Sequence, residues 1–274
     1  MLLRNHLLEG VVYQQTPNTS GILKPSLIVL HYTGGSSAKS SANHLCSPTT
    51  KASAHCVIDR TNGQIIQLAP FNVMAWHAGK SRWKDTLGVN KIAIGIELDN
   101  PGPLTKTGSV YTSWFGQDYP EDQVVQGVDP QTKRLGYWHK YSATQIQVTI
   151  ELCKLLCAEY GIKDIVGHSD VSSTKSDPGP AFPMEQFRRE VLGGNRRDDD
   201  AEDPVEVTQR KPRIPAKVNT EYLNFRAGPG LHYETIADPL PNLTIVDVID
   251  TKNGWSLVEV KRKGWVQDTY LKKG

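Results

Sequence analysis

Two histidines and an aspartate in this 274-residue chain follow short apolar runs in a way that suggests a metal site. The run LIVL leads directly into His31, and the run DIV, with one glycine between, leads into His168; Asp177 follows nine residues later. Two histidines and one carboxylate are a usual ligand set for a catalytic zinc ion, which keeps a fourth position for water and lowers that water's pKa to about 7. The three residues are therefore candidate zinc ligands.

Hydrolysis at such a centre needs a general base, and Glu97 at the end of KIAIGIEL is the candidate. Side chains alternate along a strand, so Ala93, Gly95 and Glu97 share one face. We expect the small residues beneath Glu97 to leave room for a substrate. Lys175 is a candidate for placing a positive charge near a developing oxyanion.

Each of these residues also has a purely structural interpretation. His31 can be a core histidine with satisfied hydrogen bonds, Glu97 a solvated carboxylate at a strand end, and Lys175 a solvated loop lysine. We interpret His44 and His139 as non-ligands, because the three-ligand set is complete without them.

The elements that must position these residues alternate between strand-like and helical patterns. β-Branched runs bounded by Gly, Asn or Pro predict strands at 26–33, 54–60, 63–69 and 91–99. Helices are predicted at 142–161, with Ser142 and Gln145 as a capping box and Gly161 as the terminal glycine, and at 183–192. Strands and helices mixed around one sheet indicate an α/β domain over residues 1–193.

A second domain is predicted after a change of composition. Residues 194–216 are charged, contain prolines and have almost no large apolar side chains, which is typical of a linker. Residues 217–274 show short strand-like runs separated by the turn signals Ala227-Gly228-Pro229-Gly230 and Asn253-Gly254. Short strands at this spacing predict a small all-β barrel.

The composition excludes several classes of protein. A net charge of +2 and a pI near 8.2 are too balanced to indicate a nucleic-acid partner. No run is long enough to span a membrane, and the N-terminal residues do not form a secretory signal. The four cysteines include no CxxC pair, and we interpret Cys153 and Cys157 as small buried hydrophobic residues rather than a disulfide.

The segment between Glu97 and the predicted helix at 142–161 is rich in aromatic residues. Their faces, interleaved with polar groups, suit sugar stacking or the wall of a groove, and the alternative is a loop that packs its own aromatics over the domain. The residues are Tyr111, Trp114, Phe115, Tyr137 and Trp138.

Five sequence blocks together resemble a known family. HYTGGS, SAHCVIDRTNGQIIQLAP, AWHAG, IAIGIELDN and GHSDVSSTKSDPGPAFP occur in the order and spacing of the zinc-dependent N-acetylmuramoyl-L-alanine amidases, which are related to phage lysozyme-type amidases and animal peptidoglycan recognition proteins. The resemblance covers residues 20–190 and is to the Gram-negative branch with an aspartate ligand. The final part resembles bacterial Src-homology-3-like domains through YLNFRAGPGLHYETIADPLPNLTIVDVID, NGW and GWVQDTYL.

The resemblance implies a role for each matching position. One zinc ion would be held by His31, His168 and Asp177, with Glu97 as general base and Lys175 as the cation that stabilises the oxyanion. The remaining matches imply substrate-binding positions at His55, Trp76, His77, Ala78 and Gly79. Ala54 stands where phage lysozyme-type members have a tyrosine, so Glu97 would carry more of the proton transfer.

The implied reaction is hydrolysis of the amide between N-acetylmuramic acid and L-alanine of the peptidoglycan stem peptide, with the C-terminal domain contacting cell-wall peptides. Two alternatives stay open: a non-catalytic peptidoglycan-binding receptor, and a zinc endopeptidase that cuts within the stem. Without an evident signal peptide, we expect a lytic enzyme that reaches the periplasm or a target cell by lysis or a dedicated secretion route. Recycling in the cytoplasm is less favoured, because it would not need a wall-tethering module. The oligomeric state is not predicted.

Overall fold

The computed structural model describes residues 1–193, 214–226, 229–231, 235–252, 254–260, 263–267 and 271–273. The chain divides into two compact units, Met1–Asp198 and Asp199–Gly274. Most of the predicted linker, residues 194–213, lies outside the described residues, and so do Ala227, Gly228 and Asn253 of the predicted turns.

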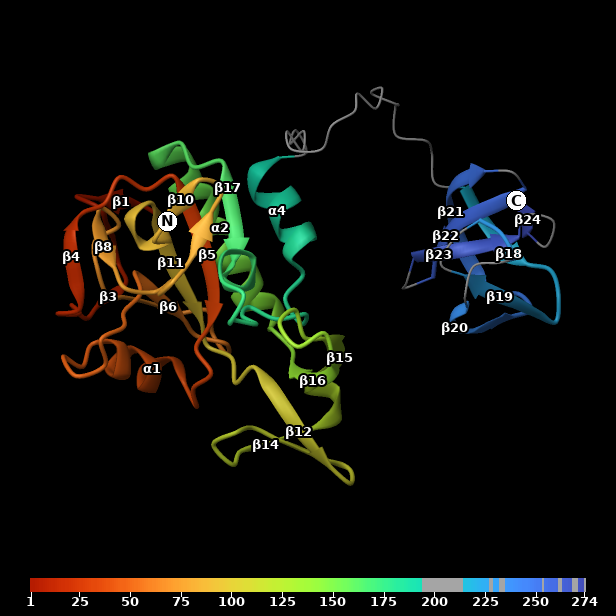
Figure 1. Ribbon diagram of the computed structural model, residues 1–274, viewed down its shortest axis with the longest axis horizontal. Coiled ribbons are helices and arrows are strands. Elements are labelled where there is room, and N and C mark those ends of the chain that lie inside the picture. The colour runs from red at the N-terminus through yellow and green to blue at the C-terminus, as the bar shows by residue number, and fades with distance from the viewer. Residues whose placement is uncertain are drawn as a thin grey trace. The chain divides into compact units, whose positions relative to one another are not determined.

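A six-stranded mixed sheet forms the centre of the first unit (Figure 1). Neighbouring strands are parallel except for β6 and β7, which are antiparallel. In spatial order the strands are β17 (Asp164–Gly167), β5 (Leu27–Tyr32), β11 (Ala93–Leu98), β6 (Cys56–Ile58), β7 (Ile65–Gln67) and β3 (Val12–Tyr13). The prediction of a mixed α/β domain is confirmed.

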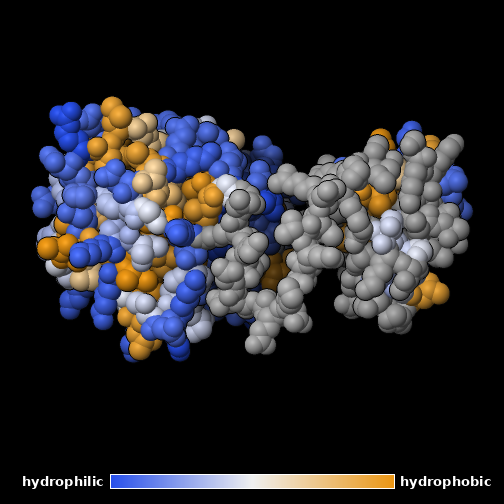
Figure 2. Space-filling view, turned by 90° about the horizontal axis from the view of Figure 1, so that it is seen from above, coloured by the Kyte–Doolittle hydropathy of each residue, from blue (hydrophilic) through white to orange (hydrophobic). Residues whose placement is uncertain are grey.

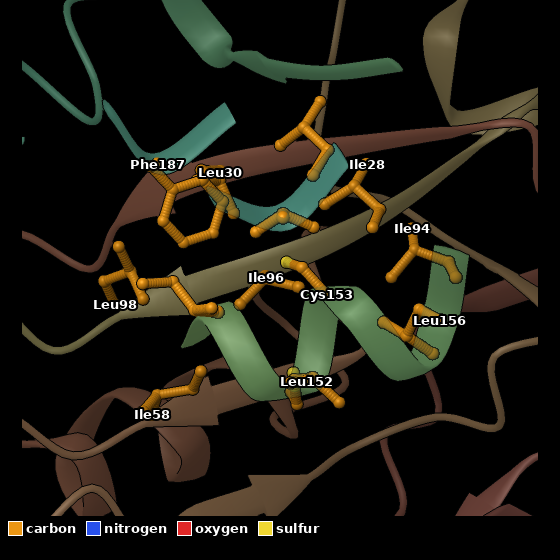
Figure 3. Packing of buried hydrophobic residues seen from close by; sticks show 14 of the residues in the cluster. Ile28, Leu30, Ile58, Ile94, Ile96, Leu98, Leu152, Cys153, Leu156 and Phe187 are labelled. Carbon is orange, nitrogen blue, oxygen red and sulfur yellow. The ribbon is translucent and has the colours of Figure 1, made fainter. Parts of the chain in front are cut away.

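One face of this sheet is covered by helices α2 (Ala143–Tyr160) and α4 (Met184–Leu192). Figure 3 shows Cys153 and Leu156 of α2 beside Ile96 and Ile94 of β11, and Leu152 belongs to the same buried cluster. Fully burying a side chain such as leucine contributes about 1.5–3 kcal/mol, so this layer stabilises the sheet on which the site is built. Neither Cys153 nor Cys157 forms a disulfide; Cys153 is buried as predicted, whereas Cys157 is only partly buried.

Helix α2 begins and ends where expected, but its cap differs from the prediction. The Ser142 side chain accepts a hydrogen bond from the Gln145 backbone N–H, and Gly161 adopts a left-handed conformation at the C-terminus. The Gln145 side chain does not return to Ser142: its amide donates to the carbonyls of Ile58 and Asp99. It therefore ties the helix to the sheet, which a capping box would not do.

The opposite face of the sheet carries a smaller apolar cluster and the candidate site. Leu27 and Val29 of β5 and Ala93 of β11 are buried there. Because side chains alternate along each strand, the next positions on this face are His31 and Gly95, followed by Glu97. These polar residues lie at the carboxyl ends of the parallel strands, a common place for ligand sites in α/β sheets.

A second sheet follows β11 directly and contains the aromatic segment. It has a small core of its own, formed by Leu104, Tyr111, Tyr119 and Val124 with Tyr137 packed against them. In spatial order its strands are β14 (Asp118–Tyr119), β13 (Val110–Thr112), β12 (Pro103–Thr107), β16 (Leu135–His139) and β15 (Val124–Val128). The segment is thus a folded sheet, which the sequence analysis did not predict.

Shorter elements complete the first unit. They are helices α1 (Ala38–Leu45) and α3 (His168–Val171), the 3₁₀ turns Val89–Lys91 and Glu121–Gln123, and the strand pairs β1 (Leu3–Arg4) with β2 (Leu7–Leu8), β4 (Thr19–Ile22) with β8 (Val73–Ala75), and β9 (Arg82–Trp83) with β10 (Thr86–Leu87). On the face seen in Figure 2, hydrophobic residues of this unit lie in small groups between hydrophilic ones. None of the helices described here has the length and apolar character needed to cross a membrane.

The second unit is a seven-stranded antiparallel sheet. Its small core contains Val218, Leu223, Phe225, Val246 and Val258. In spatial order the strands are β20 (Thr235–Pro241), β19 (Tyr222–Arg226), β23 (Lys263–Gln267), β22 (Trp255–Glu259), β21 (Ile245–Lys252), β18 (Ile214–Val218) and β24 (Leu271–Lys273).

Candidate metal centre and the cavity beside it

The structure brings His31, His168 and Asp177 together. His31 lies near the end of β5, His168 begins α3 directly after β17, and β5 and β17 are neighbours in the sheet. The Nδ1 atoms of the two histidines lie 3.0 Å apart, and Asp177 Oδ2 lies 2.8 Å from that of His31 and 2.9 Å from that of His168. All three residues are buried. They form the group of described residues that could hold a metal ion.

The loop that carries Asp177 is held at several points. The Asp177 carbonyl accepts a hydrogen bond from the Ser169 N–H at 3.0 Å, and the Tyr141 hydroxyl donates to the Pro178 carbonyl at 2.7 Å. A Cβ at Gly167 would lie 2.7 Å from Pro178 Cδ, so this glycine permits the close approach of the loop to β17. The carboxylate is thereby placed opposite the two imidazoles.

A chain of hydrogen bonds determines which nitrogen of His31 carries its proton. His77 Nε2 lies 3.1 Å from the Ala93 carbonyl, which can only accept, so that nitrogen must be protonated. Burial, together with the nearby histidines, keeps the pKa of His77 well below its usual value, so its ring is neutral and Nδ1 is an acceptor. His31 Nε2 lies 3.0 Å from that Nδ1 and must donate to it. His31 is therefore left with an unprotonated Nδ1, because burial also lowers the pKa of this ring despite its contact with Asp177.

A hydrogen bond to a backbone carbonyl also fixes the tautomer of the second histidine. His168 Nε2 lies 3.3 Å from the Ala78 carbonyl, which again requires a proton on that nitrogen. In its neutral form His168 then presents an unprotonated Nδ1 to Asp177. Fixing the tautomer of a ligating histidine through its other nitrogen is a common feature of metal sites.

The donor set fits a metal ion on these grounds. Burial alone would raise the pKa of Asp177, but its contacts with His168 and His31 hold it well below the usual range, so the carboxyl is ionised. Two nitrogen lone pairs and a carboxylate oxygen within 3.0 Å of one another repel unless a proton or a cation lies between them. A divalent cation bound by all three relieves this repulsion.

Glu97 lies beside this group on the adjacent strand. Burial, followed by the negative charge of Asp177, raises the pKa of Glu97 well above its usual value, and the positive charge of Lys175 opposes the rise. Its Oε2 atom is buried and has no hydrogen-bond partner among the described residues. A carboxyl group with a raised pKa and a free oxygen is suited to proton transfer.

The space beneath Glu97 is not open to a substrate, so that prediction is wrong. A Cβ on Gly95 would lie 2.3 Å from Cγ of His77, which means that the His77 ring occupies the room the glycine provides. The small residue serves to place a histidine behind His31. Lys175, in contrast, is exposed in the loop before Asp177, and its charge acts on both Glu97 and His31.

The other positions implied by the family resemblance lie around the metal group. His55 is buried; its Nδ1 accepts from the Gly95 N–H, and its Nε2 donates to the Val73 carbonyl. Trp76 is partly exposed and donates from its indole to the Ser20 hydroxyl, and Gly79 is exposed. Their part in substrate binding stays a prediction. His44 and His139 are not in the metal group, as expected.

A cavity of about 340 Å³ adjoins Glu97. Its lining includes Thr33 and Ser41 on the side of the β5–α1 loop and helix α1, and Trp114 in the turn between β13 and β14. Ser41 was not among the residues predicted from the sequence. The signal was weak: Ser37 caps α1, but the helix is rich in small and polar residues and lacks a clear apolar stripe.

Comparison with known proteins gives the following similarities. The N-acetylmuramoyl-L-alanine amidase family matches residues 22–180. The N-acetylmuramoyl-L-alanine amidase AmiD of Escherichia coli is 33% identical over 177 residues, which cover 61% of this chain and 53% of AmiD. The 1,6-anhydro-N-acetylmuramyl-L-alanine amidase AmpD of the same organism is 31% identical over 139 residues, which cover 50% of this chain and 57% of AmpD. The chain thus spans little more than half the length of these two relatives.

Among solved structures, one that is similar is the complex of Escherichia coli AmiD with anhydro-N-acetylmuramic acid-L-Ala-D-gamma-Glu-L-Lys. It is 30% identical, with a TM-score of 0.46, and the match covers 64% of this chain and 60% of that chain.

Proposed function

The chain belongs to the N-acetylmuramoyl-L-alanine amidase family, and we propose on that basis that it is a peptidoglycan hydrolase. The bond cleaved is the amide between the lactyl group of N-acetylmuramic acid and L-alanine of the stem peptide. The observation that carries this proposal is the convergence of His31, His168 and Asp177 next to Glu97, a residue that lines a cavity.

The proposed cofactor is one zinc ion held by His31, His168 and Asp177. Two imidazole nitrogens and a carboxylate oxygen suit zinc. When bound, zinc supplies a Lewis acid that polarises the carbonyl and a water molecule that is acidic enough to ionise near neutral pH. The hydrogen bonds from His31 to His77 and from His168 to the Ala78 carbonyl orient the two rings toward the ion.

Glu97 is the proposed general base and later the general acid. Its free Oε2 accepts a proton from the attacking water and delivers it to the leaving amine of L-alanine. The raised pKa of Glu97 favours this second transfer, because a weakly acidic carboxyl can hold a proton until the amine leaves. Lys175 places a positive charge near the oxyanion of the tetrahedral intermediate.

Incubation of the chain with purified sacculi tests the proposal. Mass spectrometry of the released fragments should find intact stem peptides that begin with L-alanine. Glu97→Gln is the matched control, because it keeps the size of the side chain but cannot take up a proton. Fragments cut within the stem would indicate an endopeptidase instead, and binding to sacculi without release would indicate a receptor.

For the second unit we propose a bacterial Src-homology-3-like module that contacts cell-wall peptides. The antiparallel sheet of β18 to β24 supports this proposal. Tethering an enzyme to its polymer raises the effective substrate concentration without new contacts at the active site. Co-sedimentation with sacculi should therefore be weaker for a chain ending at residue 193, while cleavage of a small muramoyl peptide should not change.

A further inference from the structure

The cavity beside Glu97 has one wall that comes from the second sheet. Trp114 and Phe115 lie in the turn between β13 and β14 and face the β5–α1 loop across the cavity. The turn is well ordered by its own hydrogen bonds: the Ser113 N–H donates to the Gln117 carbonyl at 2.8 Å, and the Gln117 N–H returns to the Ser113 hydroxyl at 3.0 Å. The aromatic pair is therefore held on a closed turn.

Trp114 is exposed and yet fixed in place. The residue is 76% exposed, and its indole N–H donates a hydrogen bond to the Gly34 carbonyl at 2.6 Å. Phe115 packs edge-on against it, with ring centroids 5.6 Å apart. A tryptophan ring that is anchored at its polar edge and uncovered on its face suits a ligand with an apolar surface.

Two residues that line the same cavity carry buried polar atoms without partners. Ser41 is only 8% exposed, and its hydroxyl has no hydrogen-bond partner in the part of the chain that the structure describes. Glu97 Oε2 is the second such atom. Buried polar groups are normally hydrogen-bonded, so two unsatisfied atoms on residues that line one cavity favour a ligand with polar groups.

From these contacts we propose that the cavity is a saccharide subsite in which Trp114 stacks on a pyranose ring of the glycan. This inference rests on the proposed function, because it names the part of the peptidoglycan that the site receives. The apolar face of a sugar ring suits an aromatic side chain, and its hydroxyl groups suit the hydroxyls of Thr33, Ser36, Ser40 and Ser41. Among the described residues that line the cavity there is no lysine or arginine and one histidine, His44, so the lining suits the neutral hydroxyl groups of a sugar better than the carboxylates of a stem peptide.

Two small substrates with the same scissile amide test the role of Trp114. One is an N-acetylmuramoyl tripeptide, and the other is the same tripeptide carrying only the lactoyl group, without the sugar. Trp114→Ala should lower kcat/KM about tenfold for the muramoyl peptide, as expected when an aromatic contact is lost, and leave kcat/KM for the lactoyl peptide unchanged. Val110→Ala, an exposed position on the same hairpin, is the control and should change neither.

A binding measurement separates this inference from the amidase activity. Peptide-free disaccharide of N-acetylglucosamine and N-acetylmuramic acid is added to the full ¹⁵N-labelled chain, and the indole N–H signal of Trp114, identified by its loss in Trp114→Ala, should shift. If the signal shifts but neither peptide is cleaved, the amidase proposal fails and the saccharide subsite stands. An unshifted signal, or an equal loss of activity on both peptides in Trp114→Ala, would overturn the subsite.

Discussion

His31 and Glu97 occupy the same rung of the parallel pair β5 and β11. In-register residues of neighbouring strands point to the same face, with backbones about 4.8 Å apart, so the sheet itself sets the separation between the metal group and the proposed base. A substitution of Glu97 that keeps the backbone of β11 in place should therefore leave His31, His168 and Asp177 where they are.

Replacing Glu97 by glutamine should lower turnover of a muramoyl peptide by about a hundredfold or more, because a positioned acid–base group is lost. Zinc content should stay at the level of the unmodified chain, because Glu97 is not a ligand. Turnover close to normal in this variant would remove Glu97 from the mechanism.

Lys175→Met should move the acid limb of the pH profile of kcat/KM to higher pH. The positive charge of Lys175 lowers the pKa of Glu97, against burial and the charge of Asp177, both of which raise it. Without the lysine, Glu97 holds its proton to higher pH, and the base form appears later as the pH rises. Lys175→Arg, which keeps the charge, is the control. An acid limb at the same pH in the Met and Arg variants would show that Lys175 does not act on Glu97.

His77→Ala should weaken zinc binding about 10- to 100-fold, as for other groups that orient a ligating histidine. The reason is that His31 loses the acceptor for its Nε2 proton, so Nδ1 is no longer kept free. Competition with a chelator measures the affinity directly, without any activity. His44→Ala, an exposed histidine on α1 outside this chain of hydrogen bonds, should have no effect.

Gly95→Ala also tests the hydrogen bond from His31 to His77, by displacing the His77 ring. An added Cβ would lie 2.3 Å from the ring of His77, so the ring must move. We expect weaker zinc binding in this variant too, although Gly95 has no side chain and is not one of the three proposed ligands. Unchanged affinity in both variants would show that His77 does not position His31.

Stability should decrease as the pH falls from about 6.5 toward 4. Burial, followed by the charge of Arg60, lowers the pKa of His139 to about 4, so the unfolded chain takes up a proton in this window before the folded chain does. The loss from His139 is of the order of 2–3 kcal/mol. His55, whose pKa burial also lowers to about 4, contributes in the same window. Denaturant unfolding at several pH values should therefore show a flatter dependence for His139→Gln, and an unchanged slope would contradict this account.

The sequence was informative where local patterns decide the structure. Alternation along 91–99 predicted that Ala93, Gly95 and Glu97 share one face of β11, and Ser142 and Gly161 marked the ends of α2. The convergence of His31, His168 and Asp177 was predicted from the residue types and the family resemblance. In the structure the two histidines meet because β5 and β17 are neighbours in the sheet.

What the sequence did not predict depends on contacts between distant segments. The position of the His77 ring over Gly95 and the anchoring of Trp114 on the Gly34 carbonyl join residues 18 and 80 positions apart, and no periodicity encodes them. Gln145 satisfied the pattern of a capping box, yet its side-chain amide donates to the buried carbonyls of Ile58 and Asp99. Leaving those carbonyls unpaired would cost more free energy than leaving the Ser142 backbone N–H without the Gln145 side chain.

Elemental analysis of the folded chain tests the central claim most directly. After equilibration with zinc and removal of the excess, the unmodified chain should contain one zinc ion per molecule, and Asp177→Ala should have lost most of it while keeping its circular dichroism spectrum. Folded, unmodified chain that cleaves peptidoglycan without bound metal, or an Asp177→Ala variant that binds zinc as tightly as the unmodified chain, would contradict the account.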